Sequence, residues 1–152
     1  MIVRRLDEIE GTERDVRART FASRRFLLQK DRMGFSFHDT VLYAGMETGM
    51  WYRNHVEAVY CIEGEGELRV LPDGPVYEIR PGTMYALDGH EKHSLRARTD
   101  LRMICVFNPP LAGQEVHDED GSYPLLTGEN LPVGIEPASP PAEKIMLESG
   151  TR

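Results

Sequence analysis

Short stretches rich in aromatic and β-branched residues recur along the chain from Phe26 onward. Turn-forming Gly, Pro and Asp residues separate almost all of them. They lack the 3.6-residue period of an amphipathic helix, and many short strands at close spacing are typical of an antiparallel sandwich or barrel. The pattern therefore predicts an all-β fold, with strands at residues 26–29, 35–43, 58–63, 66–71, 75–79, 83–87, 93–98 and 102–107.

The two ends of the chain depart from this pattern. Near the N-terminus, residues 6–17 have some helical character, and Gly11 is expected to end a short helix there. After Tyr123, prolines recur too often for a strand ladder and apolar residues are too sparse for a core. We therefore expect one domain over residues 1–125 and an extended or mobile tail over residues 126–152, which can serve as a lid if it folds back.

The overall composition limits the classes of partner. The chain has 152 residues, which suits one domain, and a formal net charge of -7, which disfavours binding to a nucleic acid backbone. It contains no apolar run near the roughly 18 residues that a membrane helix needs, and its N-terminus lacks the apolar stretch of a signal peptide. We expect a cytoplasmic protein that contacts neither nucleic acid nor membrane.

Two further interpretations concern the cysteines and the basic residues. Cys61 and Cys105 lie in apolar stretches, and a reducing compartment disfavours a disulfide between them, so we expect two thiols. The basic residues between positions 14 and 26 are interpreted as a solvated edge, or as the source of an arginine that binds a small carboxylate.

Two blocks of sequence carry the candidate chemistry. In the first block, residues 49–67, Gly49 is followed by His55, Glu57 and Gly64. This spacing resembles the first half of the signature of the cupin jelly-roll barrel. Glu57 stands where the second histidine of that signature usually lies.

The second block, residues 77–97, resembles the other half of the cupin signature. Pro81 and Gly82 match the turn that opens its strand, and His93 follows twelve residues after Pro81, where cupins keep their last metal-binding histidine. Tyr85 lies on the strand between them.

The two blocks together predict a metal site. His55 and Glu57 alternate along a strand, so both side chains point into the barrel, and the second block brings Tyr85 and His93 towards them. An imidazole, a carboxylate and a phenolate oxygen around one point suit a divalent metal. A single inward His or Tyr is more often a hydrogen-bonded core residue, but the agreement between two blocks favours ligands.

Longer segments carry a closer resemblance. They are GFSFHDT, NHVEAVYCIEGEGE, RPGTMYALDGHEKH and CVFNPPLAGQEVHDEDGSYPL, together with the N-terminal MIVR. These segments are similar to the signature segments of the ectoine synthase family, and the similarity covers residues 1–125. The segment EVHDEDG is specific to that family rather than to cupins in general.

The resemblance implies an iron-dependent hydro-lyase. Such an enzyme closes N-γ-acetyl-L-2,4-diaminobutyrate into ectoine, a compatible solute for osmotic stress, with loss of water. The implied metal is Fe²⁺, although Zn²⁺ or Mn²⁺ also suits mixed nitrogen and oxygen ligands. The implied ligands are Glu57, Tyr85 and His93, whereas the pattern of cupins in general favours His55 over Tyr85. The implied assembly is a homodimer, to which N-terminal residues 1–6 can contribute a strand.

The resemblance also implies the residues around the substrate. The positions that face it are Phe21, Ser23, Arg25, Thr40, Tyr52, Cys105 and Phe107, with Glu115 and His117 near the reacting groups. The family commonly has Trp where this chain has Phe21, so an aromatic wall is kept and an indole donor is lost.

Ring closure requires the α-amine to attack the acetyl carbon of the same molecule, which a bent substrate favours through proximity. One group must act as base and another as acid, and we expect Tyr52, Glu115 and His117 to share these roles in an order that the sequence leaves open. Glu115 and His117 alternate in sequence and are expected to point inward together from a strand end.

Two other functions are considered. An iron cupin dioxygenase would use oxygen at a site with two or three histidine ligands, and the shortage of histidines here disfavours it. A cupin sensor would bind a small molecule without turnover, and it would need an attached partner or DNA-binding segment that the sequence does not show.

Overall fold

The structure, a computed structural model, describes residues 1–125. Its elements are α1 (Leu6–Ile9), β1 (Asp15–Arg17), β2 (Phe21–Leu27), the 3₁₀ turn η1 (Gln29–Asp31), β3 (Ser36–Leu42), β4 (Glu47–Met50), β5 (Val56–Glu63), β6 (Gly66–Val70), β7 (Val76–Ile79), β8 (Met84–Leu87), β9 (His93–Ala97) and β10 (Leu101–Asn108). The all-β prediction is confirmed. The predicted tail at residues 126–152 lies outside the described residues.

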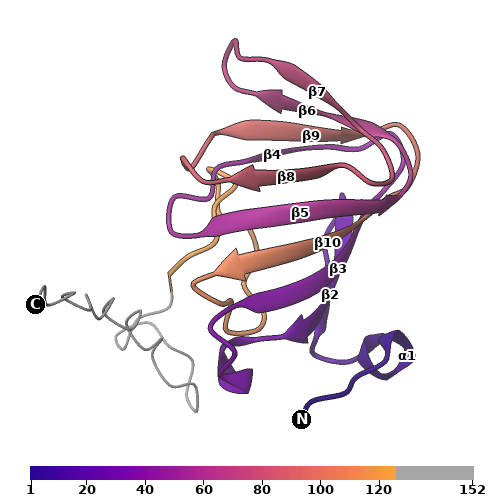
Figure 1. Ribbon diagram of the computed structural model, residues 1–152, viewed down its shortest axis with the longest axis vertical. Helices are drawn as coiled ribbons and strands as arrows, with labels where there is room; N and C mark the ends of the chain where they lie inside the picture. Colours follow the sequence, from indigo (N-terminus) through magenta and orange to yellow (C-terminus); the bar gives the residue numbers. More distant parts are fainter. Residues whose placement is uncertain (126–152) are drawn as a thin grey trace, which may run out of the picture.

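The strands form two antiparallel sheets that face each other as a jelly-roll barrel (Figure 1). The larger sheet has the order β1-β2-β3-β10-β5-β8, and the smaller one has the order β4-β9-β6-β7. β10 is central, because it pairs with β3 on one side and β5 on the other. Strands that are distant in sequence therefore present their inward side chains next to one another.

The space between the sheets is filled by side chains that alternate along each strand. On β5 the burial alternates residue by residue, and on β10 buried positions alternate with half-buried ones. This two-residue period places one face of each strand in the core. The core includes Leu42, Val59, Cys61, Leu68, Ile79, Leu87, Leu95, Leu101 and Met103.

The N-terminal region differs from the sequence prediction in two ways. The helix covers only Leu6–Ile9, and the chain turns at Gly11, which has a φ of 72°, a value that favours glycine. Asp15–Arg17 forms β1, which pairs with β2. β2 in turn begins at Phe21, five residues before the first strand that the pattern predicted. The arginines of this region masked the alternation, because their side chains are polar although the strand is largely buried.

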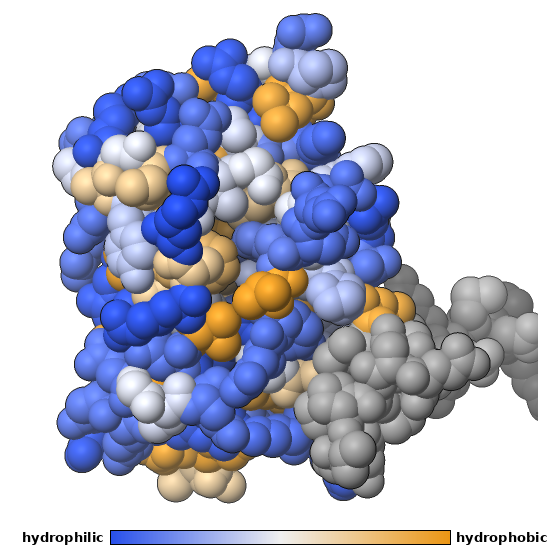
Figure 2. Space-filling view, turned by 180° about the vertical axis from the view of Figure 1, so that it is seen from behind, coloured by the Kyte–Doolittle hydropathy of each residue, from blue (hydrophilic) through white to orange (hydrophobic). Residues whose placement is uncertain are grey.

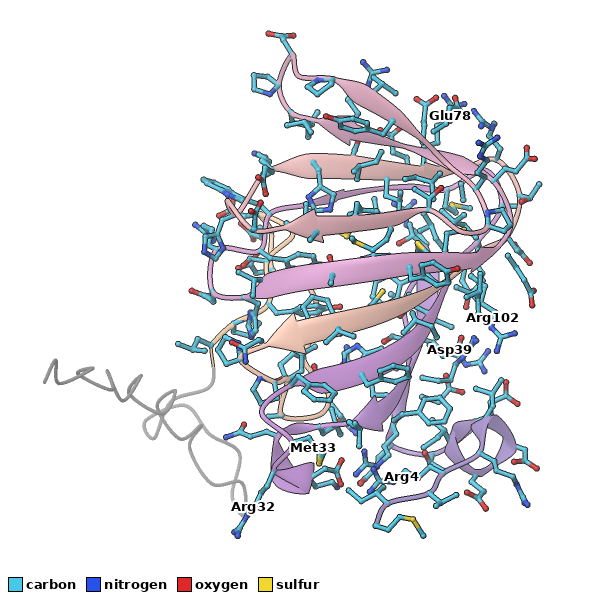
Figure 3. The ribbon with its side chains drawn as sticks, in the orientation of Figure 1. Arg4, Arg32, Met33, Asp39, Glu78 and Arg102 are labelled. Atoms are coloured by element: carbon cyan, nitrogen blue, oxygen red, sulfur yellow. The ribbon has the colours of Figure 1, made fainter. Side chains whose placement is uncertain are left out.

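The interpretation of this basic region as a solvated edge is wrong for Arg24 and Arg25, which are both buried. Arg24 lies 2.5 Å from the carboxylate of Asp39, which also accepts from Arg102 at 2.7 Å. Figure 3 shows Asp39 and Arg102 side by side on the outer side of the sheet. Ion pairs with Asp39 stabilise the charges of Arg24 and Arg102 on the outer face of the sheet. Arg25 points to the opposite, inner face.

Residues 109–125, which we call the strap, follow β10 and close one end of the barrel (Figure 1). The strap bonds to segments next to the sheets: Gln29 of η1 donates its backbone N–H to the carbonyl of Leu111, and Trp51, directly after β4, donates to that of Gly121. Gly121 has a φ of 77°, and a Cβ there would collide with the carbonyl of Gly49. This glycine allows the strap to lie directly against the end of β4.

The surface seen from behind in Figure 2 is mostly hydrophilic, with small apolar areas between polar side chains. In the described part of the chain, no helix has the length and apolar character that crossing a membrane requires. Both cysteines are free and buried, so the prediction of two thiols is confirmed.

Candidate functional site

A cavity lies between the two sheets, at the end that the strap covers. It is lined by side chains from strands of both sheets, from the segment after β4 and from the strap. Nine of the twelve predicted site residues line this cavity, namely Phe21, Ser23, Thr40, Tyr52, Glu57, Tyr85, Cys105, Phe107 and His117. The other three, Arg25, His93 and Glu115, are buried but are not among the lining residues.

Strand register explains why residues so far apart in sequence meet. Ser23 lies opposite Thr40 on β3, and Phe107 lies opposite Glu57 on β5. Cys105 belongs to the same inward face of β10 as Phe107, because the two are two residues apart. The inward faces of four adjacent strands thus form one polar and aromatic wall.

Glu57 is the acidic residue of this wall. It is buried, and the thiol of Cys105 donates to its carboxylate. Burial raises the pKa of Glu57 to about 8. No residue that the structure describes forms an ion pair with Glu57, so the carboxylate lacks the cation that would stabilise its charged form.

Tyr85 and His93 supply the other two predicted donors. Tyr85 lies opposite Val59 on β5, and burial together with the Glu57 carboxylate raises the pKa of its phenol. His93 is fully buried, and its Nδ1 lies 3.0 Å from the carbonyl of Glu91. Because a carbonyl only accepts, Nδ1 carries the hydrogen, and Nε2 keeps a lone pair that has no protein partner in the described part of the chain.

These donors fit a divalent cation. The described residues contain no group of three His, Cys, Asp or Glu side chains placed to hold a metal, so a site here requires the Tyr85 oxygen beside Glu57 and His93. A carboxylate without a cation and an imidazole with a free, buried lone pair are the groups that a metal would satisfy. The metal and its ligands therefore stay a prediction that the structure supports.

His55 is the alternative third ligand. Like His93, it is buried, does not line the cavity, and has a ring nitrogen, here Nδ1, without a hydrogen-bond partner in the described part of the chain. Its ring packs edge-on against Phe107 and Tyr123, with centroids 6.3 and 6.4 Å apart. Burial lowers the pKa of His55 to about 4, so the ring is neutral at neutral pH.

Across the cavity, Tyr52 and His117 form a hydrogen-bonded pair. The phenol oxygen of Tyr52 lies 2.9 Å from Nε2 of His117. Burial, and then the charge of Arg25, lower the pKa of His117 to about 4, whereas burial raises that of Tyr52. Tyr123 stacks on His117 at 4.4 Å between centroids. At neutral pH the pair is a neutral imidazole beside a phenol, which can exchange a proton with a ligand.

Glu115 and His117 do not lie on a strand end as expected. β10 ends at Asn108, and both residues belong to the irregular strap, where strand alternation does not apply. His117 reaches the cavity, but the Glu115 carboxylate accepts from the backbone amides of Ala112 and Gly113 at 2.5 and 2.7 Å. Through these contacts the Glu115 carboxylate stabilises the conformation of the strap.

Arg25 connects this strap to the barrel wall. Its guanidinium donates to the carbonyls of Gly113 and Glu115 at 2.5 and 2.7 Å, and it lies 3.6 Å from the Glu115 carboxylate. It also lies over the ring of Tyr123, 5.7 Å from the centroid. Arg25 therefore reaches the cavity only through the residues that it positions.

Among the cavity residues that the predicted set omitted, two have rings with polar groups, His38 and Tyr123. His38 lines the cavity from β3, and Tyr123 lines it from the strap. His38 alternates with Thr40 on one strand, which is the signal that could have identified it. Tyr123 follows an irregular segment, so no periodicity predicts its direction.

Comparisons with known proteins point to one family. A family model described as ectoine synthase matches residues 1–127. The L-ectoine synthase of Desulfatibacillum aliphaticivorans is 62% identical over 128 residues, which cover 83% of this chain and 98% of that protein. A crystal structure of ectoine synthase from P. lautus has a TM-score of 0.76 and 65% identity, and the match covers 83% of this chain and 91% of that one.

A more distant structure supports the fold alone. The plu4264 protein from Photorhabdus luminescens has a TM-score of 0.58 at 14% identity, and the match covers 70% of this chain and 87% of that one. The fold is a cupin jelly roll, as the two-block pattern predicted.

The predicted metal ligands can be tested by metal content. Glu57→Ala and His93→Ala should each remove most of the bound divalent metal, because each deletes one of only three protein donors, while the barrel stays folded. Tyr85→Phe should also lose metal, whereas His55→Ala should keep it. Elemental analysis and circular dichroism on the same preparations measure both properties. Metal retained in Tyr85→Phe but lost in His55→Ala would show that His55 is the third ligand.

Proposed function

Since this chain belongs to the ectoine synthase family, and is thus a hydro-lyase, we propose that it converts N-γ-acetyl-L-2,4-diaminobutyrate into L-ectoine and water. One observation carries the proposal. A single cavity has the Glu57 carboxylate and Tyr85 phenol in its lining, together with a hydrogen-bonded Tyr52–His117 pair. These are the groups that an intramolecular condensation with proton transfer requires.

The lining of the cavity suits a ring closure. The α-amine and the acetyl carbon belong to one molecule, so a site that keeps the substrate bent supplies much of the rate through proximity. The walls contain aromatic and apolar side chains such as Phe21, Phe107 and Leu95. Such walls favour a compact conformation of the substrate and keep bulk water away from it. Bulk water would otherwise favour the extended conformation of the substrate.

We propose that Glu57, Tyr85 and His93 hold a divalent metal, Fe²⁺ in the cell, with Zn²⁺ as an alternative. A bound divalent cation supplies Lewis acidity towards the acetyl amide oxygen, which gains negative charge as the carbonyl is attacked. The Cys105 thiol, which donates to Glu57, helps to fix the orientation of that carboxylate.

The proton transfers are assigned to the opposite wall. The α-ammonium loses one proton before its nitrogen bonds to the acetyl carbon and a second as the carbon–oxygen bond breaks, and the acetyl oxygen takes up two protons and leaves as water. His117 is a neutral imidazole within 2.9 Å of the Tyr52 phenol, so one can accept a proton while the other donates. Glu115 holds the segment that carries His117, through the backbone amides of Ala112 and Gly113.

Phe21, Ser23, Thr40 and Phe107 are proposed to contact the substrate directly, because all four line the cavity. Arg25 is proposed to act through the strap. The proposed setting is the cytoplasm, where ectoine would serve as a compatible solute under osmotic stress, and the two reduced cysteines agree with such a compartment.

We also propose a homodimer. Met1 and Val3 are among the most exposed apolar residues, and residues 1–5 have no strand partner within the described chain. An extended apolar segment of this kind can pair with a sheet edge of a second copy.

The proposed reaction can be tested by anaerobic incubation of the metal-loaded protein with N-γ-acetyl-L-2,4-diaminobutyrate. Formation of ectoine without oxygen is expected, and removal of the metal by a chelator should lower the rate at least tenfold. Chromatography with mass spectrometry measures both compounds. A requirement for oxygen would indicate the dioxygenase alternative, and binding without any product would indicate the sensor.

The roles of Glu115 and His117 differ in their expected effects. His117→Ala should lower kcat by roughly 10²- to 10⁴-fold, as lost acid or base catalysis typically does, while metal content and melting temperature stay near normal. Glu115→Gln should lower the melting temperature as well as the rate, because an amide nitrogen would face a backbone N–H. The exposed neighbour Glu119→Gln is the control. A Glu115→Gln protein that loses rate at unchanged melting temperature would place Glu115 in the proton transfers themselves.

Light scattering coupled to size-exclusion chromatography tests the dimer. The full chain of 17.3 kDa should elute with twice that mass. A variant without residues 1–3 should shift towards the monomer while retaining its circular dichroism spectrum. An intact dimer in the truncated protein would exclude the N-terminal segment from the interface.

A further inference from the structure

The loop between β8 and β9 contacts the segment that carries Tyr52 through two hydrogen bonds. Nδ1 of His90, in this loop, lies 2.7 Å from the carbonyl oxygen of Tyr52. In the other direction, the indole N–H of Trp51 donates to the carbonyl of His90 at 3.0 Å. We call this reciprocal pair of bonds the clasp. It joins the β4–β5 and β8–β9 connections, which lie at the end of the barrel that the strap covers (Figure 1).

His90 makes both contacts of the clasp from an unusual backbone conformation. A carbonyl oxygen only accepts, so Nδ1 of His90 carries a hydrogen and donates it to Tyr52. The φ of His90 is 55°, in the left-handed region that residues other than glycine rarely adopt. Strained backbone of this kind is found preferentially where function requires one geometry. The strain at His90 therefore lies at the residue that contacts the Tyr52 segment.

A cation–π contact adds to the clasp. The Trp51 ring has the guanidinium of Arg53 at 5.0 Å and the ammonium of Lys92 at 5.3 Å from its centroid. Arg53 belongs to the same segment as Trp51, whereas Lys92 belongs to the β8–β9 loop. The loop therefore contacts the segment through a side chain as well as through the two hydrogen bonds.

The Tyr52 segment needs such contacts because it belongs to no strand. β4 ends at Met50 and β5 begins at Val56, so no ladder of hydrogen bonds fixes the backbone between them. The phenol of Tyr52 nevertheless has to lie 2.9 Å from Nε2 of His117. A hydrogen bond to the carbonyl of Tyr52 itself restrains the backbone from which that phenol projects.

The same loop also restrains His93. Nδ1 of His93 lies 3.0 Å from the carbonyl of Glu91, the residue that follows His90. The rings of His93 and Tyr52 have centroids 6.0 Å apart. Two successive loop residues thus restrain one predicted metal ligand and one proposed proton-transfer group. The loop therefore sets the distance between these two parts of the site.

We propose that His90 is a positioning residue, which holds the Tyr52 phenol in place for proton transfer through the hydrogen bond from Nδ1 to the Tyr52 carbonyl. The proposal rests on the proposed function for the role of Tyr52. His90 is exposed and does not line the cavity, so it acts through Tyr52 and not by touching the substrate. Its loss should therefore lower kcat and leave substrate binding nearly unchanged.

A matched pair of substitutions tests this role on the metal-loaded enzyme. Asn and Asp have the same shape and both tolerate a positive φ, but only Asn has an N–H donor where Nδ1 of His90 lies. His90→Asn should keep kcat within about threefold, because it keeps the hydrogen bond. His90→Asp should lower kcat by roughly 10- to 100-fold, since a displacement of about 1 Å can cost a factor of 10². KM and metal content should stay near those of the unmodified enzyme.

Steady-state kinetics separates kcat from KM, and elemental analysis measures metal. His90→Gly keeps the left-handed backbone without a donor, so it should behave as His90→Asp does. Asp88→Asn, at an exposed position of the same loop, is the control and should change neither kcat nor KM. Equal kcat in the Asn and Asp variants would overturn the proposal. So would a loss of metal in parallel with the rate, since that result would place the effect at His93.

A double-mutant cycle tests whether His90 acts through Tyr52. In a Tyr52→Phe protein, the phenol that His90 positions is already absent. Adding His90→Asp to that protein should therefore lower the residual kcat by less than about threefold, whereas independent effects would multiply. A further fall as large as the one in the unmodified enzyme would overturn the proposal.

Two spectroscopic readouts do not depend on turnover. Nitrogen NMR of the unmodified enzyme should show His90 protonated at Nδ1, and a ring with hydrogen on Nε2 alone would overturn the proposal even if every variant failed to fold. Trp51 is the only tryptophan of the chain, so its indole hydrogen is a single signal. That hydrogen should exchange faster with water in His90→Gly, and unchanged exchange would contradict the clasp. Failure of the proposed function would look different, because the unmodified enzyme would then form no ectoine at all.

Discussion

The buried guanidinium of Arg25 is the interaction on which the closed end of the barrel depends. It belongs to a strand of the larger sheet, yet its donors reach the carbonyls of Gly113 and Glu115 in the strap. Removing one partner of such a buried charged group typically costs about 3–5 kcal/mol, because the other partner is left without compensation. The strap contains no regular secondary structure in the described chain, so these side-chain contacts replace the ladder that would otherwise fix it.

The position of the strap in turn fixes the aromatic side of the cavity. His117 and Tyr123 both belong to it; Tyr123 stacks on both His117 and Tyr52, and the His117 ring lies tilted against that of Tyr52. Arg25 lies over the Tyr123 ring and also lowers the pKa of His117, after the larger effect of burial. One buried arginine therefore fixes the place of the proposed proton-transfer group and adds to the burial that keeps its imidazole neutral. Arg25 therefore affects the site although its side chain does not line the cavity.

Strand periodicity explains how much of this site the sequence could predict. Residues on predicted strands, such as Glu57 and Cys105, line the cavity as alternation and the family resemblance implied, whereas Ser23 lines it as the resemblance alone implied. The start of β2 was missed, because Arg24 and Arg25 made a buried strand look polar. Their compensating partners, Asp39 and the strap, are distant in sequence, and a local pattern contains no information about them.

The same reasoning explains the failure at Glu115 and His117. Their spacing of two suggested one common direction, but that inference holds only on a strand, and β10 has already ended at Asn108. In the strap, direction is set by specific hydrogen bonds, and those of Glu115 turn it towards Ala112 and Gly113. Tyr123 was overlooked for the same physical reason.

The proposed chemistry is divided between these two kinds of structure. The predicted metal ligands lie on β5, β8 and β9, where ladder hydrogen bonds on paired strands hold each backbone in place. The Tyr52–His117 pair lies outside the strands and is fixed by stacking and by the strap. A metal requires donors at closely defined distances, which a sheet supplies, whereas proton transfer requires two groups that can adjust as a ring closes. A rigid wall facing an irregular one is therefore an arrangement that meets both requirements.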